Sequence, residues 1–436
     1  MCEHGDRGSF AAARRQATRR AARRQATRPT RRTRRATALV LPLTLSLGMA
    51  IGAAGQLAAE TQTRSFRQAF PVTPGASLRL GNLAGRVELV AGTGNQVVID
   101  ANVHAEMPGG GETQRVLQEM KWVKSQDSKG REEWDLNYPV DRYRSYFYPE
   151  PREGSDSGFW SLFDNSSSST TFRGERVRVY TGRRSSAPTL YADLRIALPA
   201  TSDVALRNLV GKVHGGALEG TLSLDTGSSD IRLESFAGQL RLDTGSGDVV
   251  VGSSRGETSI DTGSGDVVIH QLVGNAGIDT GSGDVRIEKV AVGKLKLHTG
   301  SGDVTVRDGA AGQLSADTGS GEVRVIGVEL EELNADTGSG DVEVTSSLER
   351  TRRITAKTGS GDVRLWAGPS ASFDVTADQS SGDLRVDYSD AVLRRGRHHH
   401  DKVVGARRGD GHTTIIIETG SGDCVIAPNS GRKHSS

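Results

Sequence analysis

The chain has 436 residues, a formal net charge of +2 and only two cysteines. It contains 55 glycines but only 9 Phe and 4 Trp, which excludes a domain built around a large aromatic core and favours thin layers joined by many tight turns. Two cysteines also exclude a disulfide framework, so the stability of the fold has to come from packing.

The first 59 residues have the composition of a secretory signal peptide. Twelve arginines occur among the first 35 residues, against the two acids Glu3 and Asp6. An uncharged, mainly apolar run from Ala36 to Ala59 follows, and it ends in small residues, an order typical of export signals. An uncleaved N-terminal membrane anchor is the alternative, although Pro42 disfavours a spanning helix. We therefore expect export to the periplasm, the cell envelope or the extracellular space.

Removal of residues 1–59 changes the charge of the chain. The rest has 43 basic and 51 acidic residues, a net charge of about −8. The arginine run therefore suits membrane targeting, and we expect no nucleic-acid partner. We expect membrane contact only through an uncleaved N-terminal segment. Cys2 lies in the expected signal peptide, which leaves Cys424 without an intrachain partner.

The next segments alternate between strand-like and irregular sequence. Residues 60–136 contain short alternating runs such as Val87 to Val90 and predict N-terminal β layers, while Gln114 to Ser125 fits a short helix or a strand. Residues 137–186 are polar and aromatic-rich and predict a loop insertion. Its aromatic side chains are the best place for a sugar-stacking surface, against simple packing or disorder as the alternatives.

A repeat dominates residues 187–426. Its pattern is apolar-polar-apolar, then Asp-Thr-Gly-Ser-Gly-Asp, then Val, any residue, and Val or Ile, as in Leu240 to Val251. About ten copies occur from residue 222 onwards, and successive second acids lie 18, 18, 18, 19, 19, 19, 21, 21 and 40 residues apart. The last gap holds a polar, His-rich insertion over residues 388–412, and residues 427–436 form a polar tail.

This period predicts an all-β fold, a parallel β-helix or β-solenoid with rungs of about 19 residues. Alternation on both sides of the motif indicates two short strands per repeat, and about 19 residues are too few for a βαβ unit. We expect right-handed winding, the general preference of parallel crossovers. Motif glycines such as Gly245, Gly247, Gly263 and Gly265 are expected to turn the chain at positive φ. The first apolar residue after each motif is predicted to form one inward ladder: Val249, Val267, Val285, Val304, Val323, Val342 and Val363.

The second motif acids are the candidate metal ligands. Stacked carboxylates about 4.8 Å apart repel, and bridging calcium ions would relieve this repulsion, as would hydrogen bonds from turn amides and hydroxyls. The calcium-binding β-roll has a nine-residue period, which favours turn chemistry here. The candidate calcium ladder consists of Asp248, Asp266, Asp284, Asp303, Asp341 and Asp362. A parallel ladder of first acids, Asp243, Asp261 and Asp279, is interrupted by His298, Lys357 and Glu418.

Two further features carry weaker hypotheses. His398, His399, His400 and His412 could bind a transition metal, against the alternative of an exposed basic loop. Cys424 occupies the place of an inward Val, so we expect a buried apolar thiol instead of a nucleophile.

Three stretches resemble a known family when taken in this order: Ala192 to Ala200, Asn208 to Val213, and the Gly-Ser-Gly-Asp-Val repeats. They resemble the bacterial family named putative adhesins, a β-strand-repeat domain of unknown function. The resemblance extends over roughly residues 66–426 and implies export and a β-solenoid.

The acids repeat almost identically from copy to copy, whereas a catalytic site is asymmetric. We therefore expect no catalytic residues and no cofactor, and a non-enzymatic, adhesin-like binding scaffold of the cell surface or envelope whose partner is an unidentified protein or glycan. The alternative is a carbohydrate-active enzyme on a parallel β-helix.

Overall fold

A computed structural model of the chain describes residues 61–73, 75–108, 110–126, 130–149, 166–182, 185–396 and 402–429. The expected signal peptide or anchor at 1–59 lies outside these residues, as do parts of both insertions and most of the C-terminal tail. The described residues are nearly all β, and their strands belong to one hydrogen-bonded sheet.

The N-terminal part, up to residue 199, contains one helix and ten strands among the described residues. The elements are β1 (Gln62–Pro71), β2 (Leu78–Ala84), β3 (Val87–Gly92), β4 (Gln96–Glu106), α1 (Gly110–Glu119), β5 (Trp122–Gln126), β6 (Glu132–Leu136), β7 (Ser145–Tyr148), β8 (Ser166–Phe172), β9 (Glu175–Thr181) and β10 (Thr189–Pro199). No helix among the described residues is long and apolar enough to cross a membrane.

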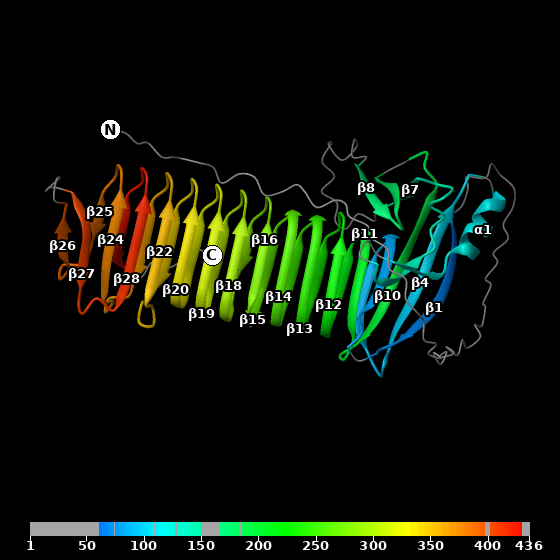
Figure 1. Ribbon diagram of the computed structural model, residues 1–436, viewed down its shortest axis with the longest axis horizontal. Helices are drawn as coiled ribbons and strands as arrows, with labels where there is room; N and C mark the ends of the chain where they lie inside the picture. The colour runs from blue at the N-terminus through cyan, green and yellow to red at the C-terminus, as the bar shows by residue number, and fades with distance from the viewer. Residues whose placement is uncertain are drawn as a thin grey trace, which may run out of the picture. The chain divides into compact units, whose positions relative to one another are not determined.

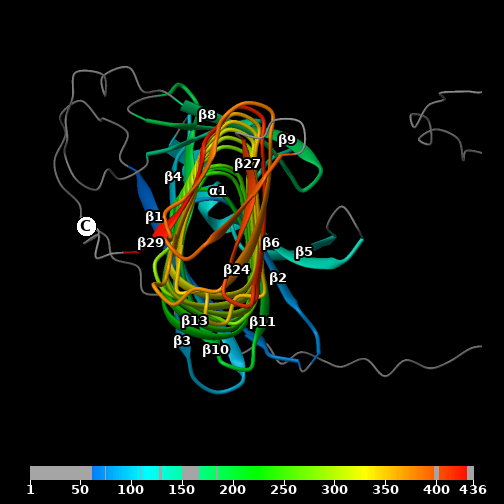
Figure 2. The same ribbon diagram turned by 90° about the vertical axis from the view of Figure 1, so that its left-hand side faces the viewer.

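The repeats form parallel strands that pair in register with the next copy. Val249 pairs with Val267, and Val342 with Val363, so the partners are 18 and 21 residues apart at these two points. The strands are β11 (Asp203–Val210), β12 (Val213–Thr226), β13 (Ile231–Ser246), β14 (Val249–Ser264), β15 (Val267–Val273), β16 (Ala276–Thr280), β17 (Val285–Ile287), β18 (Val290–Thr299), β19 (Val304–Thr318), β20 (Val323–Thr337), β21 (Val342–Ser346), β22 (Arg353–Thr358) and β23 (Val363–Ala367). In Figure 1 they follow one another as successive layers, and in Figure 2, viewed along the stack, the layers overlie one another.

The core is built from ladders of equivalent apolar side chains. The predicted valine ladder is confirmed, because each valine pairs with the next and none is more than 2% exposed: Val249, Val267, Val285, Val304, Val323, Val342 and Val363. Cys424 pairs with Val363 and is fully buried, as predicted. In-register stacking places each branched side chain of this ladder against its equivalents above and below, which buries apolar area layer by layer.

Motif threonines fasten the corner from inside. Thr318 is buried, and its Oγ1 donates to the Gly302 carbonyl oxygen at 2.8 Å and accepts from the Gly321 amide at 3.1 Å. The same pair of bonds recurs at Thr358, to Gly340 and from Gly361. Each threonine therefore links its own turn to the preceding layer.

The expected positive φ at the motif glycines is wrong. Gly263 and Gly265 are not among the glycines with positive φ, whereas Gly238 and Gly256, in the third segment of the repeat, have φ of 128° and 121°. The motif glycines are required by close approach instead. A Cβ on Gly265 would lie 2.1 Å from the carbonyl oxygen of Gly247 in the preceding layer. In-register stacking of the corners leaves no room for a side chain at this position.

The N-terminal part adds antiparallel strands beside the first layers. β2 and β3 pair in parallel with β11 and β12, so residues 78–92 form a layer of the stack although more than 100 residues separate them from their partners. β4 pairs antiparallel with both β1 and β10. The expected loop insertion at 137–186 contains β7, β8 and β9, and Val177 and Val179 of β9 alternate toward the core.

At the C-terminal end the spatial order of the layers differs from the sequence order. The strands here are β24 (Phe373–Gln379), β25 (Leu384–Val386), β26 (Val392–Arg395), β27 (Val403–Arg408), β28 (Thr413–Thr419) and β29 (Cys424–Pro428). β28 pairs in parallel with β22 on one side and with β24 on the other, so the layer made last in sequence lies between two earlier ones (Figure 1). β27 pairs antiparallel with β24 and with β26 within the insertion at 388–412, which covers the outer edge of β24.

Candidate functional site

One position of the repeat forms a continuous column of mostly charged side chains at the corner of the stack. It is the residue directly before the inward valine, and we call it the corner column. In spatial order the column consists of Asp193, Arg86, Lys212, Asp230, Asp248, Asp266, Asp284, Asp303, Glu322, Asp341, Asp362, Asp423 and Asp383.

The acids of the corner column bind backbone amides of the neighbouring layer. Asp266 Oδ1 accepts a hydrogen bond from the Asp284 amide at 2.9 Å, and Asp284 Oδ1 accepts from the Asp303 amide at 2.8 Å. The same bond joins Asp341 to the Asp362 amide at 2.8 Å. Every candidate calcium ligand, Asp248, Asp266, Asp284, Asp303, Asp341 and Asp362, makes this bond to the next layer. A repeated need for an acceptor at this point explains why the motif ends in Asp.

Arginine side chains offset part of the charge of this column. Arg364 donates to Asp341 Oδ2 and to Asp362 Oδ2, each at 2.6 Å. Burial acts to raise the pKa of the Asp341 carboxyl, but the Asp362 amide and Arg364 together lower it below its ordinary value. At Glu322 burial raises the pKa above its ordinary value despite the nearby Arg324.

The column of first motif acids is arranged differently. The interruptions predicted from the sequence contact acids of neighbouring layers: His298 Nδ1 lies 3.3 Å from Asp317 Oδ1, and Lys357 Nζ forms an ion pair with Glu418 Oε2 at 2.7 Å. At the N-terminal end of this column burial, and then the charge of Asp243, raises the pKa of Asp225. Within the described residues no group of three or more His, Cys, Asp or Glu side chains is placed to hold a metal ion.

The residues proposed for a histidine metal site and for an aromatic sugar-stacking surface lie partly outside the described residues. His398, His399, His400, Phe159, Trp160 and Phe163 are not described. The described His412 is exposed, and its amide donates to Ser372 Oγ at 3.2 Å. Tyr138, Tyr146 and Tyr148 are buried in the core, with exposed fractions of at most 1%. These three tyrosines serve packing and do not form an exposed stacking surface.

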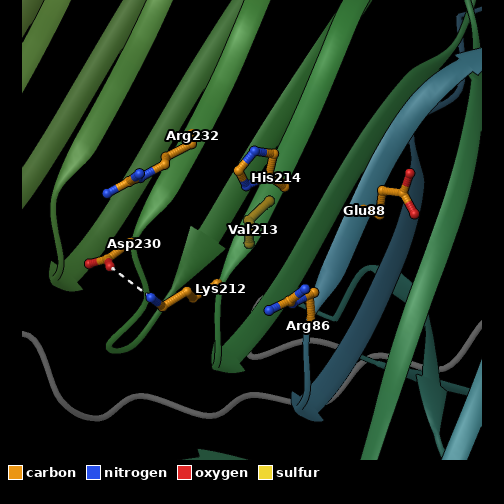
Figure 3. A pocket seen from close by; sticks show the side chains of 7 residues that line it. All are labelled: Arg86, Glu88, Lys212, Val213, His214, Asp230 and Arg232. Carbon is orange, nitrogen blue, oxygen red and sulfur yellow. Dashed lines mark ion pairs between the residues drawn. The ribbon is translucent and has the colours of Figure 1, made fainter. Parts of the chain in front are cut away.

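The corner column changes sign at Arg86 and Lys212, and a cavity lies there. Its volume is about 270 Å³, and its lining comprises Arg86, Glu88, Lys212, Val213, His214, Asp230 and Arg232 (Figure 3). Three neighbouring strands supply these residues, because β12 pairs with β3 on one side and β13 on the other. Val213 is buried, so the exposed and half-buried side chains of this lining are charged residues and His214.

The rim of this cavity carries Arg86, Lys212 and Arg232 as cations, with His214 beside them. Lys212 Nζ lies 3.9 Å from Asp230 Oδ2, and Arg195 Nη1 lies 3.6 Å from Glu88 Oε1, so each acid of the rim is near a cation. Arg86 and Lys212 are half-buried, while His214 and Arg232 are exposed. The arrangement suits an anion better than a cation.

Sequence reasoning missed this cavity, although a signal for it was present. Gly85-Arg86-Val87 and Gly211-Lys212-Val213 match the Gly-Asp-Val end of the repeat motif with a basic residue in place of the acid. The first of these stretches is separated from the second by more than 100 residues, so only the pairing of β3 with β12 brings them together.

The solved structures that resemble this chain include two with low sequence identity and low TM-scores. One structure, described as a "putative cell adhesion protein" from Clostridium sporogenes, shares 8% sequence identity with a TM-score of 0.16, and the match covers 84% of this chain and 100% of that chain. The other, described as a "putative lipid binding protein" from Parabacteroides distasonis, shares 10% identity with a TM-score of 0.31, covering 83% and 96% of the two chains. No curated protein matches the sequence.

The family comparison is specific for the repeats. Residues 257–427 match the family described as Toastrack DUF4097, which confirms the resemblance expected from the Gly-Ser-Gly-Asp-Val motifs over this part of the chain. Residues 257–427 of this chain are therefore similar to the Toastrack DUF4097 family, a repeat family of unknown function.

Proposed function

We propose that this protein is an exported, non-enzymatic scaffold, adhesin-like in character, that binds a protein or a glycan at the cell surface or in the cell envelope. One observation carries the proposal: the repeated acids are engaged in holding layers together, as Asp266 holds the Asp284 amide at 2.9 Å. A carboxylate used in the same way in successive layers is a structural group, whereas catalysis needs one acid or base placed apart from the others.

The finer architecture belongs to the same proposal. We propose a right-handed β-solenoid with rungs of about 19 residues, supported by the general handedness of parallel crossovers and by pairing offsets such as Val304 to Val323. Such a stack presents parallel, outward-facing strands over a long surface, and repeat proteins use surfaces of this kind for binding.

Export of the chain also belongs to this proposal. The arginine-rich start and the apolar run to Ala59 support it. An exported scaffold without disulfides depends on its ladders for stability, and the continuous burial of the valine ladder suits that requirement.

The alternative, a carbohydrate-active enzyme, makes a distinct prediction. A sugar-cleaving site would need two carboxyl groups facing a groove, with separations fixed by the mechanism. A screen of the purified protein against cell-wall and host glycans, with binding measured on arrays and cleavage measured by mass spectrometry of the products, separates the two. Binding without new products supports the scaffold, whereas catalytic release of shorter sugars refutes it.

A further inference from the structure

We propose that the cavity at Arg86 and Lys212 is a binding site for a phosphate group. This inference rests on the proposed binding function and names a ligand class for one part of the scaffold. It is carried by the hydrogen-bonding pattern of the corner column, which is interrupted at this point.

The interruption leaves two backbone amides without the acceptor that other layers provide. Along most of the column, the carboxylate of one layer accepts from the amide of the next; the Arg86 amide itself donates to Asp193 Oδ1 at 2.8 Å. Arg86 and Lys212 have no acceptor oxygen on their side chains, so they cannot cap the layer that follows. Among the described residues, no hydrogen-bond acceptor is found for the amides of Lys212 and Asp230.

The column has a third gap of a different kind. In the corner column Asp341 lies in the layer after Glu322. The longer side chain of Glu322 pairs with Arg324 and does not accept a hydrogen bond from the Asp341 amide. A carboxylate is still present there, and it lies in a cluster of Asp303, Glu322 and Asp341. The gap at Lys212 and Asp230 differs because two successive acceptors are replaced by two cations.

A bound oxyanion would take the place of the missing carboxylates. Backbone N–H groups that point in one direction, together with cationic side chains, form the usual recognition elements for phosphate. Arg86 and Lys212 directly precede the paired residues Val87 and Val213, so they lie roughly 4.8 Å apart along the stack, and one anion between them can contact both side chains. Arg232 adds a planar guanidinium, which suits two oxygens of the same group.

Size and charge favour phosphate over a carboxylate. Two amides and two or three cations offer more donors than the two oxygens of a carboxylate can use, whereas a phosphate group has at least three acceptor oxygens. The cavity of about 270 Å³ accommodates a small group and is at the lower limit for an organic ligand. Asp230 opposes an anion, but its charge is partly offset because Oδ1 accepts from the Asp248 amide at 3.2 Å and Oδ2 lies near Lys212.

The test titrates inorganic phosphate into the purified protein and measures binding by isothermal titration calorimetry, in chloride buffer at constant ionic strength. We expect saturable binding at one site, weakened at least tenfold by Lys212→Gln and by Arg86→Gln. Arg255→Gln is the matched control, since Arg255 is an exposed arginine on β14 outside the cavity. Unchanged affinity in that variant is expected. Absence of saturable binding, or equal weakening in all three variants, overturns the proposal.

Lys212→Asp separates loss of the site from loss of the fold. This substitution restores the acid of the repeat motif and supplies an acceptor to the Asp230 amide, so it should keep or raise the melting temperature while abolishing phosphate binding. Phosphate binding that survives in a folded Lys212→Asp variant refutes the site.

The source of the phosphate group is distinguished by vesicles. Phosphatidylcholine vesicles with and without phosphatidic acid test a lipid phosphate, and competition by inorganic phosphate tests whether the same site is used. Binding to phosphatidic acid that is lost in Lys212→Asp assigns a lipid source, and binding of free phosphate alone assigns a soluble one. Vesicle binding unaffected by Lys212→Asp contradicts the proposal. If the protein binds glycans in the screen but binds no phosphate, the phosphate site is refuted and the scaffold function is kept.

Discussion

Replacement of Gly265 by Ala tests whether the corner glycines are required by close approach between layers. The added Cβ would lie 2.1 Å from the Gly247 carbonyl oxygen, whereas ordinary contact begins at 3.4 Å. The two layers would have to separate locally by roughly 1.3 Å, which is an overpacking change of about 1–3 kcal/mol. Nearby bonds would lengthen as well, among them that from the Asp266 amide to Asp248 Oδ1, each worth about 1 kcal/mol. We therefore expect a loss of about 2–4 kcal/mol.

Gly277→Ala is the matched control for this substitution. Gly277 lies on β16, one layer away from Gly265, and an added Cβ would meet no atom within 4 Å. Its φ is not positive, so the change should be neutral or stabilising by about 0.4–1 kcal/mol.

Thermal melting followed by circular dichroism, with hydrogen exchange to locate the affected layers, measures the difference. Stacked repeats often unfold in parts, so the exchange rates of β14 and β16 are more informative than one global midpoint. We expect Gly265→Ala to lower the melting temperature by about 5 °C or more and to speed exchange in these strands. Equal melting temperatures for Gly265→Ala and Gly277→Ala would refute close approach as the reason for the motif glycines.

Three further predictions follow from the corner, the core and the export signal. Asp266→Asn keeps the acceptor for the Asp284 amide, so it should leave the stability nearly unchanged, whereas Asp266→Ala should lower the stability by about 1–2 kcal/mol. Melting temperatures measured with calcium and with a chelator test the alternative. A higher melting temperature of the wild type with calcium, lost in Asp266→Asn, would support a metal ladder. Burial raises the pKa of the Cys424 thiol to about 12, so peptide mapping should show little alkylation of native Cys424 at pH 8, and rapid labelling of the native protein would contradict burial. Because the thiol of the unfolded chain ionises at lower pH, the contribution of Cys424 to the free energy of unfolding should fall as the pH rises from about 9 to 12. Cys424→Val should remove that pH dependence. Mass spectrometry of the exported protein should find its N-terminus near Glu60, and an intact Met1 in a cytoplasmic fraction would contradict export.

The repeat could be predicted from the sequence because the two features that define it, the alternation of inward and outward side chains and the turn motif, are local in sequence. Alternation identified the inward side chains, and Val285 and Cys424 lie in the core where the pattern placed them. For the Asp that ends most motifs, the sequence left amide hydrogen bonds and calcium as alternatives, and the structure shows the amide bond, as from the Asp284 amide to Asp266 Oδ1. The φ of the glycines did not follow, because a missing Cβ serves a close contact as well as a positive φ, and only coordinates distinguish the two.

The order of layers and the phosphate cavity depend on pairings that are remote in sequence. Ile354 pairs with Ile415, across the whole of β24 to β27, and no local pattern distinguishes this register from pairing with the next repeat. In the same way, Arg86 becomes a neighbour of Lys212 only because β3 joins β12. A single basic residue in a Gly-x-Val context is an ordinary surface substitution until the layers are assembled.

The insertion of β28 between β22 and β24 has a consequence for synthesis of the chain on the ribosome. Layers that stack in sequence order can form as they are made, but the layer of β24 and β25 must wait for residues 413–428 before it can join the rest. Until then one edge of β22 is open, because β20 is already paired with it but β28 has not yet been made. Completion of the last layers is thus delayed until residues 413–428 have been made, and in a chain cut short before residue 413 both β22 and β24 would lack the strand that pairs with them.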